Sequence, residues 1–132
     1  MSKTILQSVK FQVSPETLFE IYMDSKKHSA ATGAKAVISR KVGGKFTAYE
    51  GYIRGKNLLI VPHYLIAQTW GGKDFRKNDP DSILVLTFNK IRNGTRLDLV
   101  HINVPDHKHQ GIKSGWNQYY WKPWKTYLKR RS

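Results

Sequence analysis

The sequence predicts an α+β domain in which a curved antiparallel β-sheet of six or seven strands wraps around one long C-terminal helix, with two short helices after the first strand. Two observations predict this class. Between residues 34 and 104, short runs rich in β-branched and aromatic residues alternate with turns that contain glycine, proline or asparagine. Residues 111–132 then place bulky apolar side chains at helical spacing on one broad arc.

The first strand is predicted over Thr4–Val13, because four apolar residues share one parity there: Ile5, Val9, Phe11 and Val13. A helix start follows at once. Ser14 can cap the free N–H groups, Pro15 suits the first helical position, and Glu16 suits the positive end of the helix dipole. A second short helix or turn is predicted over Ser25–Thr32, ended by a glycine at position 33.

Six further strands are predicted up to Val104. Gly43–Gly44 and Arg92–Gly94 are hairpin signals, Pro62–His63 marks another turn, and Gly71–Asp81 is a polar loop. The meander has no internal repeat and no linker. Its predicted strands are Ala36–Ser39, Lys45–Glu50, Tyr52–Val61, Leu65–Trp70, Ser82–Phe88 and Thr95–Val104.

The last helix is predicted to begin near Lys108–Gly111 and holds three of the four tryptophans. Lysines lie on its outer side. Pro123 removes the hydrogen bond to the Tyr119 carbonyl, which gives either a hinge for ligand entry or a curvature fitted to the sheet. The predicted inner face consists of Ile112, Trp116, Tyr119, Tyr120, Pro123, Trp124, Tyr127 and Leu128. The seam between this face and the sheet is the expected ligand pocket.

Composition and charge bound the class of protein. The 132 residues suit one domain, 1–132, and the chain contains no cysteine, which excludes a disulfide framework and thiolate chemistry. The longest aliphatic runs have four residues, whereas a membrane helix needs about 20, so we expect a cytoplasmic protein. The net charge of +14 is spread along the chain. It indicates either a solvated basic surface or attraction to an anionic partner.

Several short motifs, in this order and spacing, resemble one known family. They are Gly44–Phe46, Gly51–Gly55, Ile66–Trp70, Asp81–Phe88, Gly94–Leu97, His101–Pro105 and Gly115–Trp116. From about Val9 to Leu128, the chain resembles the C-terminal domain of activators of the heat-shock protein 90 ATPase and their single-domain bacterial homologues. These proteins belong to the START-like (SRPBCC) superfamily.

The resemblance implies a helix-grip fold, like that of START lipid-transfer domains and the birch-pollen allergen, with a cavity between sheet and helix. It implies ligand binding, and it implies no shared catalytic residues. The sequence holds one such domain without the separate N-terminal domain of the full-length eukaryotic activators. The ATPase-stimulating role is therefore not expected to follow from the resemblance.

Nine residues are predicted to line the cavity. Trp70 shares an inward parity with Ile66 and Gln68, and His101 shares one with Leu97 and Leu99. His101 is interpreted either as a hydrogen-bonding or acid–base group of the cavity, or as a buried neutral histidine satisfied by a tyrosine or a backbone carbonyl. The nine are Trp70, Leu84, Leu86, Phe88, Leu99, His101, Trp116, Tyr119 and Tyr120.

Catalytic, metal and cofactor sites are not predicted. No nucleophile motif or paired carboxylate is recognisable, and His63, His107 and His109 lack an established metal-ligand spacing.

The first functional hypothesis is binding of a hydrophobic or aromatic small molecule, with or without a carboxylate, in a monomer or weak dimer. The alternatives are a protein-interaction module with an acidic partner, a binder of nucleic acid or anionic membrane, and an enzyme of the cyclase or hydrolase kind. A cavity of at least about 300 Å³ under the helix favours the first.

Overall fold

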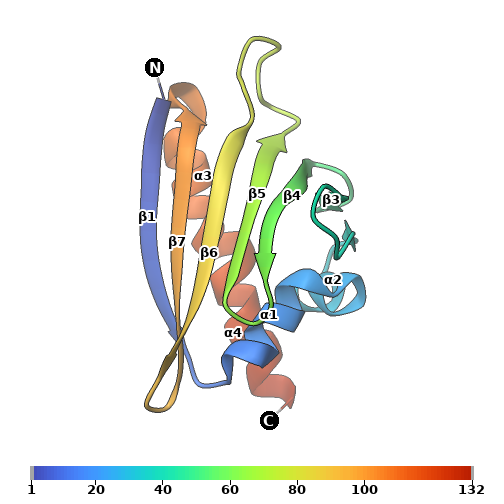
Figure 1. Ribbon diagram of the computed structural model, residues 1–132. Helices are drawn as coiled ribbons and strands as arrows, with labels where there is room; N and C mark the ends of the chain where they lie inside the picture. The colour runs from blue at the N-terminus through green and yellow to red at the C-terminus, as the bar shows by residue number, and fades with distance from the viewer. Residues whose placement is uncertain (1, 132) are drawn as a thin grey trace.

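A computed structural model describes residues 2–131 and confirms the predicted architecture. Figure 1 shows one curved layer of strands, with the C-terminal helix running across the face behind it. All seven strands pair antiparallel in the order β1-β7-β6-β5-β4-β3-β2. The strands are β1 Ser2–Phe11, β2 Val37–Ile38, β3 Lys45–Ala48, β4 Ile53–Val61, β5 Leu65–Gly72, β6 Ser82–Ile91 and β7 Gly94–Pro105.

The two short helices lie where the sequence predicts them: α1 spans Pro15–Met23 and α2 spans Ser25–Thr32. The Ser14 hydroxyl accepts a hydrogen bond from the Thr17 amide at 3.2 Å, which satisfies one of the free N–H groups of α1. Asp24 ends α1 and caps α2 in the same way. Gly33, with a φ of 80°, ends α2 in the left-handed conformation that favours glycine.

Several strand ends differ from the predicted ones. β1 ends at Phe11, two residues early, and β3 ends at Ala48 because Tyr49 and Glu50 take positive φ values of 49° and 56° and start a turn. The ladders of β5 and β6 continue past their predicted ends to Gly72 and Ile91. Glycines in β5 and polar residues in β6 hid these extensions, since backbone pairing does not require apolar side chains.

The C-terminal helix is continuous but not uniform. A 3₁₀ turn at Asp106–Lys108 leads into α3, His109–Trp116; a π-helical turn follows at Asn117–Trp121; α4 then covers Lys122–Arg131. The Lys122 amide bonds to the Asn117 carbonyl, five residues back, as in a π-helix. This turn lies directly before Pro123, whose missing N–H cannot sustain the α-helical bond pattern.

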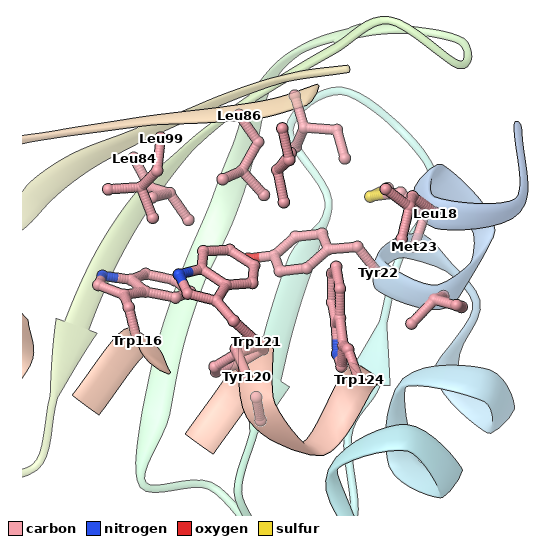
Figure 2. Close-up of a cluster of buried hydrophobic side chains, with 14 of the residues drawn as sticks. Leu18, Tyr22, Met23, Leu84, Leu86, Leu99, Trp116, Tyr120, Trp121 and Trp124 are labelled. Carbon is pink, nitrogen blue, oxygen red and sulfur yellow. The ribbon is translucent and has the colours of Figure 1, made fainter. Parts of the chain in front are cut away.

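The π turn corrects the predicted inner face of the helix. Tyr119 is 50% exposed, whereas Trp121, which the α-helical arc left out, is 2% exposed. Each residue of a π turn rotates the chain about the helix axis by a smaller angle than in an α-helix. The π turn therefore directs Tyr119 outward and Trp121 inward. Figure 2 shows Trp116 and Trp121 facing the strand leucines, while Trp124 lies beside Tyr22 near α1.

The core lies between this aromatic face, the concave side of the sheet and α1. The inward parity predicted for β6 and β7 is confirmed. Leu84, Leu86 and Phe88 on β6 and Leu97 and Leu99 on β7 are each at most 2% exposed. Within residues 2–131, no helix is both long enough and apolar enough to cross a lipid bilayer.

Candidate functional site

A cleft of about 500 Å³ opens between the start of the C-terminal helix and the β3–β5 part of the sheet. Its sheet side comes from the β3–β4 turn, β4 and β5, and its helix side comes from α3 and the π turn. The lining is mainly aromatic and aliphatic: Tyr49, Tyr52, Ile53, Trp70, Lys108, Gly111, Ile112, Gly115, Trp116, Tyr119 and Tyr120. The cleft is thus the part of the helix–sheet seam that core side chains leave unfilled.

Two glycines, one helical turn apart, form part of the helix side of the cleft, where no side chain projects from them. Gly111 and Gly115 both line it. A Cβ built on Gly111 meets no atom within 4 Å, and one on Gly115 meets only the Tyr119 ring, at 3.5 Å. Because neither position carries a side chain, neither one fills the space opposite α3.

The mouth of the cleft is shaped by a contact between Tyr49 and the π turn. The Tyr49 hydroxyl donates a hydrogen bond to the Tyr119 carbonyl, the group that loses its α-helical partner to Pro123. The two tyrosine rings also meet edge to face, with centroids 5.6 Å apart. Burial raises the pKa of Tyr49 to about 12, so the hydroxyl keeps its proton at neutral pH and remains a donor.

A polar bridge borders the other end. The Tyr52 hydroxyl donates to the Asp74 carboxylate, and the Lys108 ammonium lies 3.2 Å from the same carboxylate. The hydrogen bond from Tyr52, together with the one from Lys108, lowers the pKa of Asp74. This bridge connects the β3–β4 turn, the β5–β6 loop and the start of the helix. Among the residues that the structure describes, Lys108 is the only cationic member of the cleft lining.

A buried network holds Tyr120 at the floor of the cleft. One ring nitrogen of His28, Nδ1, lies 2.8 Å from the Tyr22 carbonyl, which can only accept; Nδ1 therefore carries the proton. Nε2 then accepts from the Tyr120 hydroxyl at 3.1 Å. The Tyr22 hydroxyl donates to Gln68, which in turn donates to Asn57. Burial lowers the pKa of His28, which favours this neutral form.

His101 is fully buried and holds the helix to the sheet. The Trp116 indole donates to its Nδ1 at 3.1 Å, so the ring proton is on Nε2, which lies 2.7 Å from the Ser82 hydroxyl. The Ser82 hydroxyl in turn donates a hydrogen bond to the Trp70 carbonyl at 2.6 Å. Burial lowers the pKa of His101 to about 3. The histidine is buried and neutral, but its partners are an indole and a serine rather than the expected tyrosine or carbonyl.

The nine predicted cavity residues fall into two groups. Four line the cleft: Trp70, Trp116, Tyr119 and Tyr120. Five lie in the packed core beside it and do not line it: Leu84, Leu86, Phe88, Leu99 and His101. Inward parity finds the concave face of a sheet but does not say which part of that face the helix covers. Contact of any of the nine with a ligand stays a prediction.

Seven lining residues are not among the nine predicted ones, although Ile112 was placed on the inner face of the helix. Tyr49 and Tyr52 lie in a turn, where periodicity carries no information, and Gly111 and Gly115 have no side chain to mark a face. A pair of glycines four apart on an aromatic helix was the one usable signal. The other three are Ile53, Lys108 and Ile112.

The histidines considered as metal ligands lie apart from the cleft lining. His107 Nε2 is 2.8 Å from an Asp79 carboxylate oxygen, which ties the β5–β6 loop to the helix start. His63 packs edge to face against Phe19. Within residues 2–131, no three histidine or carboxylate side chains come together as a metal site would require.

Comparison with known proteins supports the resemblance seen in the sequence. The family model described as "Activator of Hsp90 ATPase homolog 1-like protein" matches residues 12–129. An activator of 90 kDa heat shock protein ATPase homolog from Dictyostelium discoideum is 25% identical over 117 residues, covering 89% of this chain and 30% of that protein. The homolog 1 from Mus musculus is 29% identical over 110 residues, covering 83% of this chain and 32% of that protein.

The fold is also similar to that of solved structures. The crystal structure of a heat-shock protein 90 activator from Plasmodium falciparum superposes with a TM-score of 0.87 at 27% identity, covering 96% of both chains. The chain spans about a third of the length of the curated relatives it matches. On the family match over nearly its whole length, this helix-grip chain belongs to the family of activators of heat-shock protein 90 ATPase homolog 1-like proteins.

Proposed function

We propose that the chain binds an apolar, aromatic small molecule in the cleft between α3 and the β3–β5 part of the sheet. The observation that carries the proposal is the cleft itself. Its volume of about 500 Å³ lies within the range of about 300–1,000 Å³ common to small-molecule sites. Its walls are the rings of Trp70, Trp116 and Tyr120, which suit the flat faces of an aromatic ligand.

The polar groups around the cleft define the ligand further. The hydroxyls of Tyr49, Tyr52 and Tyr120 donate to protein acceptors, so these residues offer ring surface to a ligand. Lys108 supplies a positive charge at one end, shared with Asp74. The cleft therefore favours a ligand with an apolar ring system and one anionic group, which would approach Lys108.

The first prediction tests the cleft with anilinonaphthalene sulfonate, a fluorescent probe of this chemistry. The unchanged protein is expected to bind one probe molecule, with increased probe emission and quenching of tryptophan fluorescence from the cleft. Gly111→Leu is expected to weaken binding by at least about tenfold, or ~1.4 kcal/mol, because the new side chain enters the open space opposite α3. A fluorescence titration of both proteins measures the difference.

Gln110→Leu is the matched control, since Gln110 is exposed on the same helix and does not line the cleft. It adds the same side chain without filling the cleft and should leave binding unchanged. Leucine favours helix more than glycine does, so Gly111→Leu should unfold at no lower temperature than the unchanged protein. Equal binding by the three proteins would overturn the proposal. Native mass spectrometry of protein purified from its own cells then identifies a co-purified ligand.

The similarity to heat-shock protein 90 activators favours a second candidate function, regulation of that chaperone's ATPase. The supporting observation is the 27% identity to the Plasmodium falciparum activator over 96% of this chain. Prediction two is that the added chain changes ATP turnover by the heat-shock protein 90 of its own organism, and that the change saturates. A coupled ATPase assay measures it. Unchanged turnover, together with no co-sedimentation of the two proteins, would exclude this function and leave the ligand proposal standing.

A further inference from the structure

A second groove, of about 940 Å³, lies at the opposite end of the molecule from the cleft mouth and collects basic side chains. It is formed by three segments far apart in the sequence: the end of β1 with the residues after it, the β6–β7 hairpin, and the last turns of α4. Its lining residues are Lys10, Phe11, Gln12, Val13, Ile91, Arg92, Asn93, Arg96, Lys125, Leu128 and Lys129.

Among residues 2–131, the lining contains five cationic side chains and no carboxylate side chain. Arg96 forms an ion pair with Asp98 at 3.1 Å. Lys125 lies over the Phe11 ring, 5.4 Å from its centroid. Lys10 and Arg96 are directly opposite each other in the β1–β7 ladder, an arrangement of like charges that costs folding stability. The groove therefore concentrates positive charge beyond what the fold itself requires.

Helix stabilisation accounts for only part of this charge. Cations in the last turn of α4, such as Lys129, interact favourably with the negative end of the helix dipole. Lys10 lies at the end of a strand and Arg92 in a hairpin, so the helix dipole does not explain their presence. Both are exposed, and among residues 2–131 neither forms an ion pair with a carboxylate.

We propose that this basic groove binds an acidic peptide segment of a protein partner, with carboxylates on its basic rim and an apolar side chain on its floor. The floor is apolar: Phe11, Val13, Ile91 and Leu128. The rim is complementary in charge to several carboxylates. Arginine on the hairpin can meet a carboxylate with two parallel hydrogen bonds, which adds specificity.

Two other anionic partners fit the groove less well. Single-stranded nucleic acid is bound through aromatic platforms on which bases stack, but Phe11, the one aromatic residue of the lining, is only 4% exposed. An anionic membrane presents a flat surface that does not enter a groove, and insertion needs apolar side chains that protrude. The apolar residues here lie on the floor.

The third prediction uses a fluorescein-labelled peptide of glutamates flanking a central leucine, titrated with the full chain and followed by fluorescence anisotropy. The double charge reversal Lys10→Glu with Arg92→Glu is expected to weaken binding at least about tenfold at 0.1 M salt, because it removes two contacts and adds repulsion. Lys26→Glu with Lys27→Glu, two exposed positions on α2, makes the same change in net charge outside the groove and should weaken binding less than about threefold.

Further measurements make the result decisive. A peptide with serine in place of the leucine should bind more weakly, since it leaves the apolar floor uncovered. Circular dichroism confirms that both charge variants fold. Equal losses in the two double variants would reduce the effect to overall charge and overturn the proposal. Tighter, groove-dependent binding of a labelled single-stranded oligonucleotide or of anionic vesicles would also overturn it. The cleft lies elsewhere, so probe binding there is expected to be unchanged.

Discussion

Replacing Trp124 with alanine is expected to lower the free energy of unfolding by about 3–5 kcal/mol, the range found for large buried aromatic residues. Trp124 is 0% exposed and joins α4 to the rest of the core. Its ring meets those of Phe11, Tyr22, Tyr120 and Trp121, with centroids 5.4–6.3 Å apart. The alanine variant leaves a cavity among side chains from three elements, and urea denaturation followed by circular dichroism measures the loss.

Phenylalanine at the same position separates packing from hydrogen bonding. The Trp124 indole nitrogen is buried and has no hydrogen-bond partner among the described residues, so Trp124→Phe loses volume but no hydrogen bond. The matched change is Trp121→Phe, which also removes the 2.9 Å bond from its indole nitrogen to Gln7. We expect Trp121→Phe to cost about 1 kcal/mol more than Trp124→Phe. A loss below about 1 kcal/mol for Trp124→Ala would contradict the packing seen here.

Local signals in the sequence were sufficient for most of the fold. Ser14, Pro15 and Gly33 mark helix ends through backbone chemistry that acts within a few residues. The alternation in β6 and β7 predicts the buried face because residues of one parity are buried along most of these two strands. Such signals need no knowledge of distant partners.

The π turn could not be predicted from periodicity. An α-helical wheel assumes a constant rotation per residue, and that assumption fails between Asn117 and Trp121. The wheel therefore placed Tyr119 inside and left Trp121 out. Pro123 was the available warning, since it marks a place where the hydrogen-bond pattern must change. How the helix accommodates Pro123 depends on Tyr49, about 70 residues away, whose hydroxyl donates a hydrogen bond to the Tyr119 carbonyl.

The boundary between the cleft and the packed core also could not be predicted from the sequence. Trp70 lines the cleft, whereas Leu84 is packed in the core, although it lies on the next strand only two residues beyond Ser82, the partner of Trp70. The difference depends on where the helix crosses the sheet, and tertiary contacts such as the bond from Trp116 to His101 fix that crossing. A sequence pattern records which face is buried, not how far the covering element extends.

The fifth prediction concerns pH: the free energy of unfolding is expected to fall by about 2 kcal/mol between pH 7 and pH 5 through His101 alone. Burial lowers the pKa of His101 from 6.5 to about 3 in the folded protein. Below pH 6.5, His101 binds a proton in the unfolded chain but not in the folded chain, so acid favours unfolding. The effect grows by about 1.4 kcal/mol per pH unit until the folded pKa is reached. Burial shifts His28 in the same direction and adds to the loss.

The window from pH 7 to pH 5 isolates the histidines, because the lowered pKa values of Asp74, Asp79 and Asp98 affect stability only in stronger acid. His101→Gln serves as the test variant: its amide can accept from Trp116 and donate to Ser82, but it does not titrate. Urea denaturation of both proteins at several pH values should give a smaller slope for His101→Gln. The same slope in both would mean that His101 is charged in the folded state, and the neutral hydrogen-bond chain from Trp116 to Ser82 would then be wrong.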